Sequence, residues 1–198
     1  LSEGRLSDAY RMLQQAVAVY RQHYAGSGVL AFALRPLTAA AAALGRLDEA
    51  RAGLEESLAI AKEAWTGAPQ RWRLNRWHFD LARIELWQER FDVALRCLEQ
   101  VVPAEPGDIP PPQPDVIERD GLAVLAHLGR GDAATADRLL ATATQALPTL
   151  VERARHPALE ADLALAAGRL ALANRDPPRA RAAGRRSAGA ARPCRSAR

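Results

Sequence analysis

One segment of this 198-residue chain recurs with a period of about 42 residues, and this repeat limits the possible folds more than any other feature. The segment Gly4 to Ala9 aligns without gaps on residues 45–50, 89–94 and 131–136. After each copy, apolar residues follow at three- and four-residue spacings, as on one face of an α-helix. A weaker fifth copy places Ala180 in the small-residue position, but Gly184 stands where the other copies have leucine. The sequence therefore predicts an array of repeats that decays after the fourth copy.

Each repeat predicts a helical hairpin. Leading helices are expected over residues 29–44, 72–88, 116–128 and 159–173, and second helices are expected to start at Ser7, Asp48 and Asp92, which could cap them. A small residue at each repeat should let two helix backbones come close, at Ala9, Ala50, Ala94, Ala136 and Ala180. Because a short helix is marginal alone in water, the hairpins must stack on one another. The expected fold class is all-α, with stacked antiparallel hairpins forming a solenoid.

Composition and charge support this organisation. Hydrophobic residues make up 48% of the chain, which excludes wholesale disorder, and no apolar run reaches the ~18 residues that a membrane span needs. The net charge of +4 comes from the C-terminal end, because residues 177–198 carry seven arginines and no acid, whereas the rest has 20 basic and 23 acidic residues. We therefore expect a solenoid over 1–176, in units of about 1–25, 28–66, 70–106, 115–148 and 158–185, followed by a disordered basic tail.

Three departures from the repeat lead to specific expectations. Pro36 falls inside a leading helix and predicts a break near residues 34–36. Glu89 stands where other copies have glycine, so that turn is expected to differ in shape. The segment from Pro103 to Pro114 contains six prolines and predicts an extended loop. The loop also contains two PxxP spacings, which aromatic-lined grooves of other proteins can bind. This alternative is less favoured than a simple loop between repeats.

Residues suited to catalysis or metal binding are scattered. The four histidines lie in different repeats, and Cys97 and Cys194 are too far apart in sequence to indicate a disulfide framework. The Gly129-Arg130-Gly131 segment follows an expected helix, so it is read as a turn and not as a phosphate-binding loop. We expect no catalytic, cofactor or metal site, hence a protein that is not an enzyme, in a reducing compartment such as the cytoplasm.

The repeat Gly-X-Leu/Phe-X-X-Ala-X-X-X-Leu-X-X-Ala/Ser resembles the second half of the tetratricopeptide repeat, from Gly4 to about Ala180. The period of about 42 residues is similar to the kinesin-light-chain type. The resemblance implies a right-handed superhelix of antiparallel hairpins. Similar arrays occur in bacterial signalling proteins and in the C-terminal regions of Ser/Thr kinases, so the resemblance implies a regulatory part of such a protein.

The resemblance also implies a partner-binding groove, because members of this family hold peptides in the concave groove lined by leading helices. Carried over through the repeat register, the groove positions are Phe32, Arg35, Arg76, Phe79, Asp80, Arg83, Trp87, Glu118, Leu125, Asp162 and Arg169. All four tryptophans fall between Trp65 and Trp87, among arginines, a combination typical of binding hot spots, although Trp72 and Trp77 are expected to fill the core. Lys62 is the only lysine, which disfavours a lysine-based clamp for a terminal carboxylate.

The expected function is that of a non-catalytic module that binds a protein or peptide segment, without a small-molecule cofactor or a membrane partner. One alternative is nucleic-acid binding by the arginine-rich tail, which is disfavoured because the tail lacks aromatic residues for base stacking. The other alternative is a scaffold that forms homo-oligomers.

Overall fold

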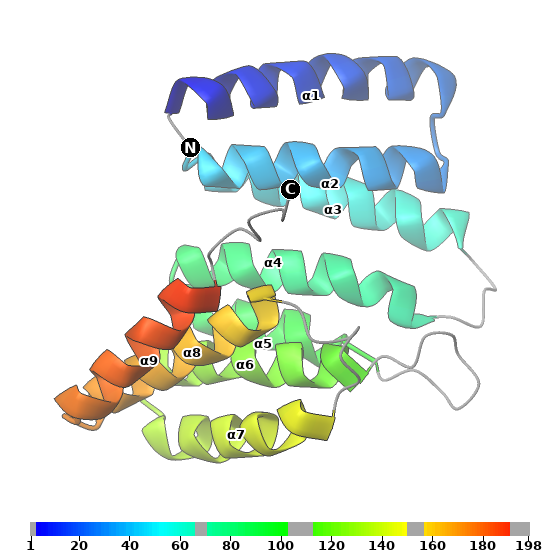
Figure 1. Cartoon of the computed structure of the whole chain (residues 1–198). Helices are drawn as coiled ribbons and strands as arrows, with labels where there is room; N and C mark the ends of the chain where they lie inside the picture. Colours follow the sequence, from blue (N-terminus) through cyan, green and yellow to red (C-terminus); the bar gives the residue numbers. More distant parts are fainter. Residues whose placement is uncertain (1–2, 66–70, 103–112, 150–156, 191–198) are drawn as a thin grey trace, which may run out of the picture. The chain divides into compact units, whose positions relative to one another are not determined.

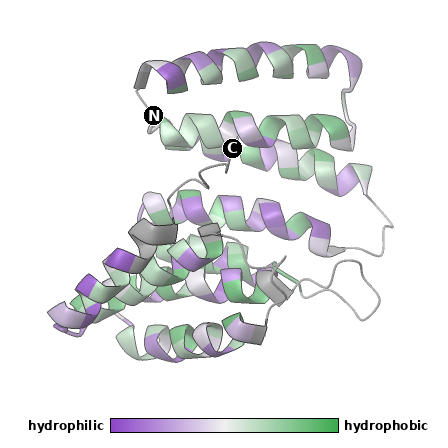
Figure 2. Cartoon of the chain, viewed as in Figure 1, coloured by the Kyte–Doolittle hydropathy of each residue, from purple (hydrophilic) through white to green (hydrophobic). Residues whose placement is uncertain are grey.

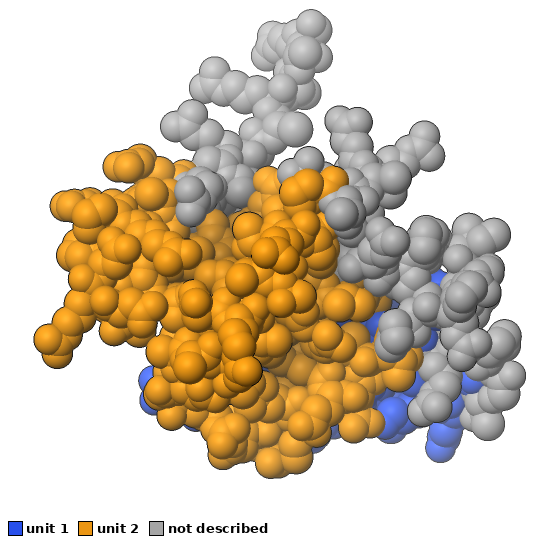
Figure 3. All heavy atoms as spheres, turned by 90° about the horizontal axis from the view of Figure 1, so that it is seen from below, with its two compact units in different colours: residues 1–90 blue, residues 91–198 orange. Residues whose placement is uncertain are grey.

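The computed structural model describes residues 3–65, 71–102, 113–149 and 157–190 (Figure 1). These residues form α-helices and two short 3-10 turns, and no strand occurs among them. The chain divides into two compact units, residues 1–90 and residues 91–198, which are coloured separately in Figure 3. The helices of the first unit are α1 (Glu3–His23), α2 (Gly28–Ala43), α3 (Leu47–Ala64), η1 (Arg71–Leu74) and α4 (Asn75–Trp87).

The second unit is also helical. Its elements are α5 (Phe91–Glu99), α6 (Gln113–Gly129), α7 (Ala133–Ala146), η2 (Leu147–Thr149), α8 (Pro157–Ala173) and α9 (Pro177–Ala190). The leading helices predicted from the repeat correspond to α2, α4, α6 and α8, with boundaries within three residues of those expected. The all-α prediction is confirmed.

Close packing of small residues holds the hairpins together. Ala50, Ala94 and Ala136 are fully buried. Helix α3 lies directly on α2, and the hydroxyl of Ser57 donates a 2.6 Å hydrogen bond to the Ala31 carbonyl. Each helix has only one face available for such packing, and α1, for example, shows hydrophilic and hydrophobic residues in alternation along its length (Figure 2). The predicted small-residue contact is formed in these copies, whereas Ala180 is half-buried and Ala9 is exposed.

The turn inside each hairpin has one backbone shape whatever residue occupies it. Gly45 and Gly131 have φ of 77° and 79°, and Glu89 and Arg175 adopt the same left-handed region at 58° and 56°. In all four turns the amide of the next residue donates to a carbonyl five positions earlier, as in the 2.9 Å bond from Arg90 to Glu85. The expectation that Glu89 gives a different turn is therefore wrong, because Glu89 adopts the left-handed conformation that glycine adopts at the equivalent positions.

Replacing Glu89 by glycine should stabilise the chain by about 1 kcal/mol, because a residue with a Cβ is disfavoured in the left-handed region. Urea unfolding followed by tryptophan fluorescence measures the change, since all four tryptophans lie in the first unit. Gly45→Ala is the matched control and should lower stability by a similar amount. A lower unfolding midpoint for Glu89→Gly would contradict this account of the turn.

Two expectations about helix ends are corrected. Helix α2 continues through Pro36, because its buried face packs on α1 and α3 while Pro36 itself is exposed, and the expected break is absent. Helix α1 begins at Glu3, so Ser7 lies inside it and not at its start. Asp48 and Asp92 lie in the first turns of α3 and α5, where their charge faces the positive helix end.

Side-chain capping occurs in later copies than expected. The Asp132 carboxylate accepts a 3.0 Å hydrogen bond from the Thr135 amide at the start of α7. Hydrogen bonding to Thr135 lowers the pKa of Asp132. Asp176 accepts a 3.1 Å bond from the Arg179 amide at the start of α9.

The predicted proline-rich loop and basic tail are described only in part. Residues 103–112 of the loop lie outside the described residues, and α6 already begins at Gln113, so Pro114 stands in a first helical turn, where proline is tolerated. Residues 177–190 form α9, which packs on α8 and buries Ala183, so this part of the expected disordered tail is helical. In this copy Ala183 is the fully buried small residue, whereas Ala180 is half-buried and Gly184 is exposed. Residues 191–198 lie outside the described residues.

No helix within the described ranges is both long enough and apolar enough to cross a membrane.

Candidate binding groove between helices α2 and α4

A groove of about 150 Å³ opens between α2 and α4 in the first unit, with α3 beneath it. Its walls carry mostly apolar atoms, and small alanine side chains on α2 leave the space open. The lining residues are Arg35, Thr38, Ala39, Ala42, Leu54, Asp80, Arg83, Ile84 and Trp87.

Two arginines share one carboxylate at the edge of this groove. Arg35 donates from Nε and Nη2 to Asp80 Oδ2, at 3.0 and 2.6 Å. Arg83 Nη1 lies 3.7 Å from Asp80 Oδ1. Two guanidinium groups thus flank a single carboxylate at this edge of the groove. All three side chains are partly exposed, so a ligand could reach them.

A cluster of aromatic residues supports Arg35. The rings of Phe32, Trp65 and Trp77 contact one another in pairs, with centroids 5.3–5.5 Å apart. The Arg35 guanidinium lies 5.2 Å from the centre of the Trp77 ring, a cation–π contact. Trp77 is fixed in turn, because it is buried and its Nε1 donates a 2.6 Å hydrogen bond to Ser57 Oγ. Arg35 is thus held by Asp80 on one side and by Trp77 on another.

The structure brings together four of the predicted groove residues, namely Arg35, Asp80, Arg83 and Trp87. Trp87 is 58% exposed at the end of α4. Phe32 lies one helical turn before Arg35 on α2 and is 53% exposed. Both aromatic residues offer apolar surface to a partner.

The remaining predicted positions are not part of this groove. Arg76 lies 5.7 Å from the centre of the Phe79 ring, and Phe79 is completely buried, so it offers no surface to a partner. In the second unit, Glu118 and Leu125 are buried in α6. On α8, by contrast, Asp162 is half-buried and Arg169 is exposed. Whether any of these residues binds a partner stays a prediction.

Sequence reasoning missed the residues that create the space, because alanines and aliphatic residues occur on every helix of this chain. Ala39 and Ala42 lie on the same side of α2 as Arg35, and Ile84 follows Arg83 on α4. The run of five alanines at 39–43 could have predicted a helix face with only small side chains, which leaves space beside the helix. Trp65, which ends α3, completes the aromatic cluster.

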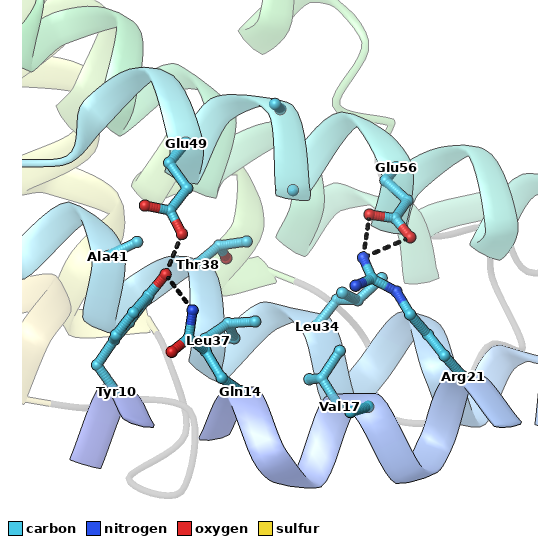
Figure 4. Close-up of a pocket in the computed structure, with 13 residues that line it drawn as sticks. Tyr10, Gln14, Val17, Arg21, Leu34, Leu37, Thr38, Ala41, Glu49 and Glu56 are labelled. Carbon is cyan, nitrogen blue, oxygen red and sulfur yellow. Dashed lines mark hydrogen bonds and ion pairs between the residues drawn. The ribbon is translucent and has the colours of Figure 1, made fainter. Parts of the chain in front are cut away.

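A larger groove, of about 490 Å³, lies between α1 and α3 and has α2 as its floor (Figure 4). Its walls are tied together at two points. The Tyr10 hydroxyl donates to Glu49, which raises the pKa of Tyr10, and Arg21 Nη2 donates to both carboxylate oxygens of Glu56, at 2.9 and 2.7 Å. A second groove of about 440 Å³ occupies the repeat-equivalent place in the other unit, between α5, α6 and α7. In the groove between α1 and α3, these pairs join the two walls to each other.

The described residues contain no group of three or more histidine, cysteine or acidic side chains that could hold a metal ion. His127 Nδ1 lies 3.3 Å from Asp132 Oδ2, beside the turn that starts α7, so it belongs to a hairpin connection.

Comparison with known structures identifies the architecture. Two structures of a putative kinesin light chain with nearly identical TPR-like repeats, from Podosopora anserina, match 94% of this chain and 87% of theirs, with TM-scores of 0.64 and 0.62 and 21% identity. BtubC (BKLC) from P. vanneervenii matches 99% of this chain and 80% of its own, with a TM-score of 0.66 and 20% identity. The chain has a tetratricopeptide-like fold. No protein-family model matches its sequence, and no curated protein does.

The tetratricopeptide-like fold explains the geometry of the groove. Helices α2 and α4 are leading helices of successive hairpins, and the second helix between them, α3, supplies Leu54 to the floor. Exposed residues of leading helices thus face one another across the groove. The predicted resemblance to long, kinesin-light-chain-like repeats is confirmed at the level of the fold.

Proposed function

We propose that this chain is a non-catalytic interaction module that binds an extended protein segment in the α2–α4 groove. The observation that supports the proposal is the joint placement of Arg35, Asp80, Arg83 and Trp87 around one apolar cavity. Tryptophan and arginine dominate binding hot spots, since they combine a large contact area with charge-assisted hydrogen bonds. A helical repeat array supplies an extended surface for such contacts.

The chemistry of the groove specifies the kind of segment. A cavity of about 150 Å³ with alanine walls suits one aliphatic side chain. Arg35 and Arg83 are partly exposed at this edge, and the N–H groups of their planar guanidiniums suit a carboxylate or carbonyl oxygen of the ligand. The preferred ligand is therefore a segment in which an aliphatic residue stands next to a side chain or backbone group that accepts hydrogen bonds. We further propose that the module belongs to a larger bacterial signalling protein in the cytoplasm, which rests on the resemblance of its repeats to those of such proteins.

Selection from a random displayed peptide library, followed by fluorescence anisotropy, tests this assignment. Combining Arg83→Ala with Trp87→Ala should weaken binding of the selected peptides at least tenfold, because it removes a hydrogen-bond donor and the apolar wall together. Arg11→Ala, at an exposed arginine of α1, is the matched control and should leave affinity unchanged. Equal affinity of the double variant and the unaltered chain would refute the groove assignment.

A further inference from the structure

Helix α9 carries a basic surface made of Arg179, Arg181 and Arg185. All three side chains are exposed, and within the described part of the chain no acidic side chain forms an ion pair with them. The nearest acid in the sequence, Asp176, caps the helix by accepting a 3.1 Å hydrogen bond from the Arg179 amide. Residues 177–198 contain seven arginines and no acid, so the sequence itself supplies no counter-charge here.

Two of these arginines lie on the outer side of α9. Ala183 is fully buried in α9, which packs on α8. Arg181 and Arg185 stand two positions before and after Ala183, so each lies about 160° around the helix axis from the buried contact. Their Cα atoms are about 6 Å apart along the axis, at about 1.5 Å per residue. Both side chains therefore leave the same side of α9, away from α8.

The other second helices of this unit mix both charges. On α5, Arg96 stands between Asp92 and Glu99, and on α7, Arg138 directly follows Asp137. Helix α9 has the equivalent place in its hairpin but contains no acid. The basic surface is therefore a local feature of α9 and not a property of the repeat.

The arginines do not stabilise α9 itself. Arg179 lies in the first turn, near the positive end of the helix dipole, where a cation is unfavourable. Arg181 and Arg185 are four positions apart, a spacing at which like charges on a helix repel each other. An anion bound to this surface would relieve both effects.

The remaining residues of α9 favour nucleic acid over other polyanionic partners. Apart from arginine, α9 contains only alanine, glycine, proline and serine. A protein interface usually needs large aromatic anchors, and a membrane surface needs apolar side chains that enter the lipid, neither of which α9 supplies. Contacts with phosphates need cations and a close approach of the helix, which the small side chains at Ala182 and Gly184 permit.

The same composition distinguishes a duplex from a single strand. Helix α9 has no aromatic ring on which the bases of a single strand could stack. A duplex presents rows of phosphates that arginine contacts without reading the bases. We infer that α9 binds the phosphate backbone of double-stranded nucleic acid through Arg179, Arg181 and Arg185, without preference for sequence. This surface belongs to the second unit, so the inference does not depend on the proposed peptide groove.

Fluorescence anisotropy of the full chain with a labelled DNA duplex of about 20 base pairs tests the inference. For three phosphate contacts, we expect log K to fall with log salt concentration with a slope of about −3. Arg181→Gln combined with Arg185→Gln should weaken binding at least tenfold at about 0.1 M salt and make the slope shallower by about 2, because two phosphate contacts are lost. Glutamine is a good helix former, so unchanged circular dichroism will show that the variant is folded.

A matched pair of substitutions separates this surface from the overall charge. Arg96→Gln combined with Arg138→Gln removes the same number of exposed arginines from α5 and α7 and should change neither affinity nor slope. Arg83→Ala with Trp87→Ala should also leave duplex binding unchanged, so that failure of the peptide site and failure of the duplex site are distinguishable.

Four results would overturn the inference. They are an equal loss of affinity in the two glutamine pairs, no duplex binding at about 0.05 M salt, tighter binding of a single strand of the same length, and equal competition by polyglutamate or by phosphatidylserine vesicles. The last result would mean that α9 attracts any anionic partner, a protein or a membrane included.

Discussion

Replacement of Trp77 by alanine should destabilise the first unit by about 4 kcal/mol, which is the usual cost of removing a large aromatic side chain from a core. Trp77 is 1% exposed, contacts the rings of Phe32 and Trp65, and donates a hydrogen bond to Ser57. Its loss leaves a cavity between α2, α3 and α4 and leaves Arg35 without its aromatic support. Total stabilities are only about 5 to 15 kcal/mol, so this change removes a large part of the stability.

Urea unfolding followed by the fluorescence of the three remaining tryptophans measures this effect. Trp87→Ala is the matched control, because Trp87 lies at the exposed end of α4 and its removal should change stability by less than about 0.5 kcal/mol. Trp77→Phe should fall between the two, since it keeps most of the packing and loses the hydrogen bond to Ser57. Similar unfolding midpoints for Trp77→Ala and Trp87→Ala would show that Trp77 does not anchor the unit.

The chain should lose about 2 to 3 kcal/mol of stability between pH 6.5 and pH 4 through His78 alone. Burial in α4 lowers the pKa of His78 from 6.5 to about 4, with a further contribution from the positive charge of Lys62. In this pH range the unfolded chain takes up a proton on His78 and the folded chain does not. The folded state is therefore favoured above pH 6.5 and loses this advantage as the pH falls toward 4.

Unfolding midpoints measured across this pH range will show the effect, and His78→Gln should flatten the profile. His23→Gln, at an exposed histidine of α1, controls for the removal of a histidine and should leave the profile unchanged. Carboxylates such as Asp132, whose pKa is lowered by its capping bonds, also contribute at acid pH, so the difference between variants is the informative quantity. If His78→Gln and the unaltered chain lose stability in parallel, His78 is not the group responsible.

Periodicity predicted the hairpins well, because burial of one helix face leaves a strong pattern in the sequence. It placed Ala50, Ala94 and Ala136 correctly in fully buried contacts. It failed where local preference and packing disagree. Pro36 was expected to break a helix, but the energy of packing along the whole of α2 exceeds the cost of one proline. Glu89 was expected to change a turn, but it adopts the same left-handed conformation as Gly45 and Gly131.

The groove was only partly predictable for a related reason. The repeat register assigns a residue to the correct helix and turn, so it grouped Arg35, Asp80, Arg83 and Trp87. It does not distinguish a residue at the edge of a groove from a residue in the adjacent core. Such residues can be neighbours in the sequence, separated by only about 100° around the helix axis. Phe79 was therefore assigned to the groove although it is completely buried.

The uniform hairpin turn also bears on how such a chain can change length. Gly45, Glu89, Gly131 and Arg175 share one backbone conformation and one closing hydrogen bond, so the same turn recurs in successive copies. Duplication or deletion of one 42-residue module would then preserve the joints on either side. The array can therefore gain or lose whole 42-residue modules without a change in the shape of its turns. The turn residues can be substituted later, as Glu89 and Arg175 show.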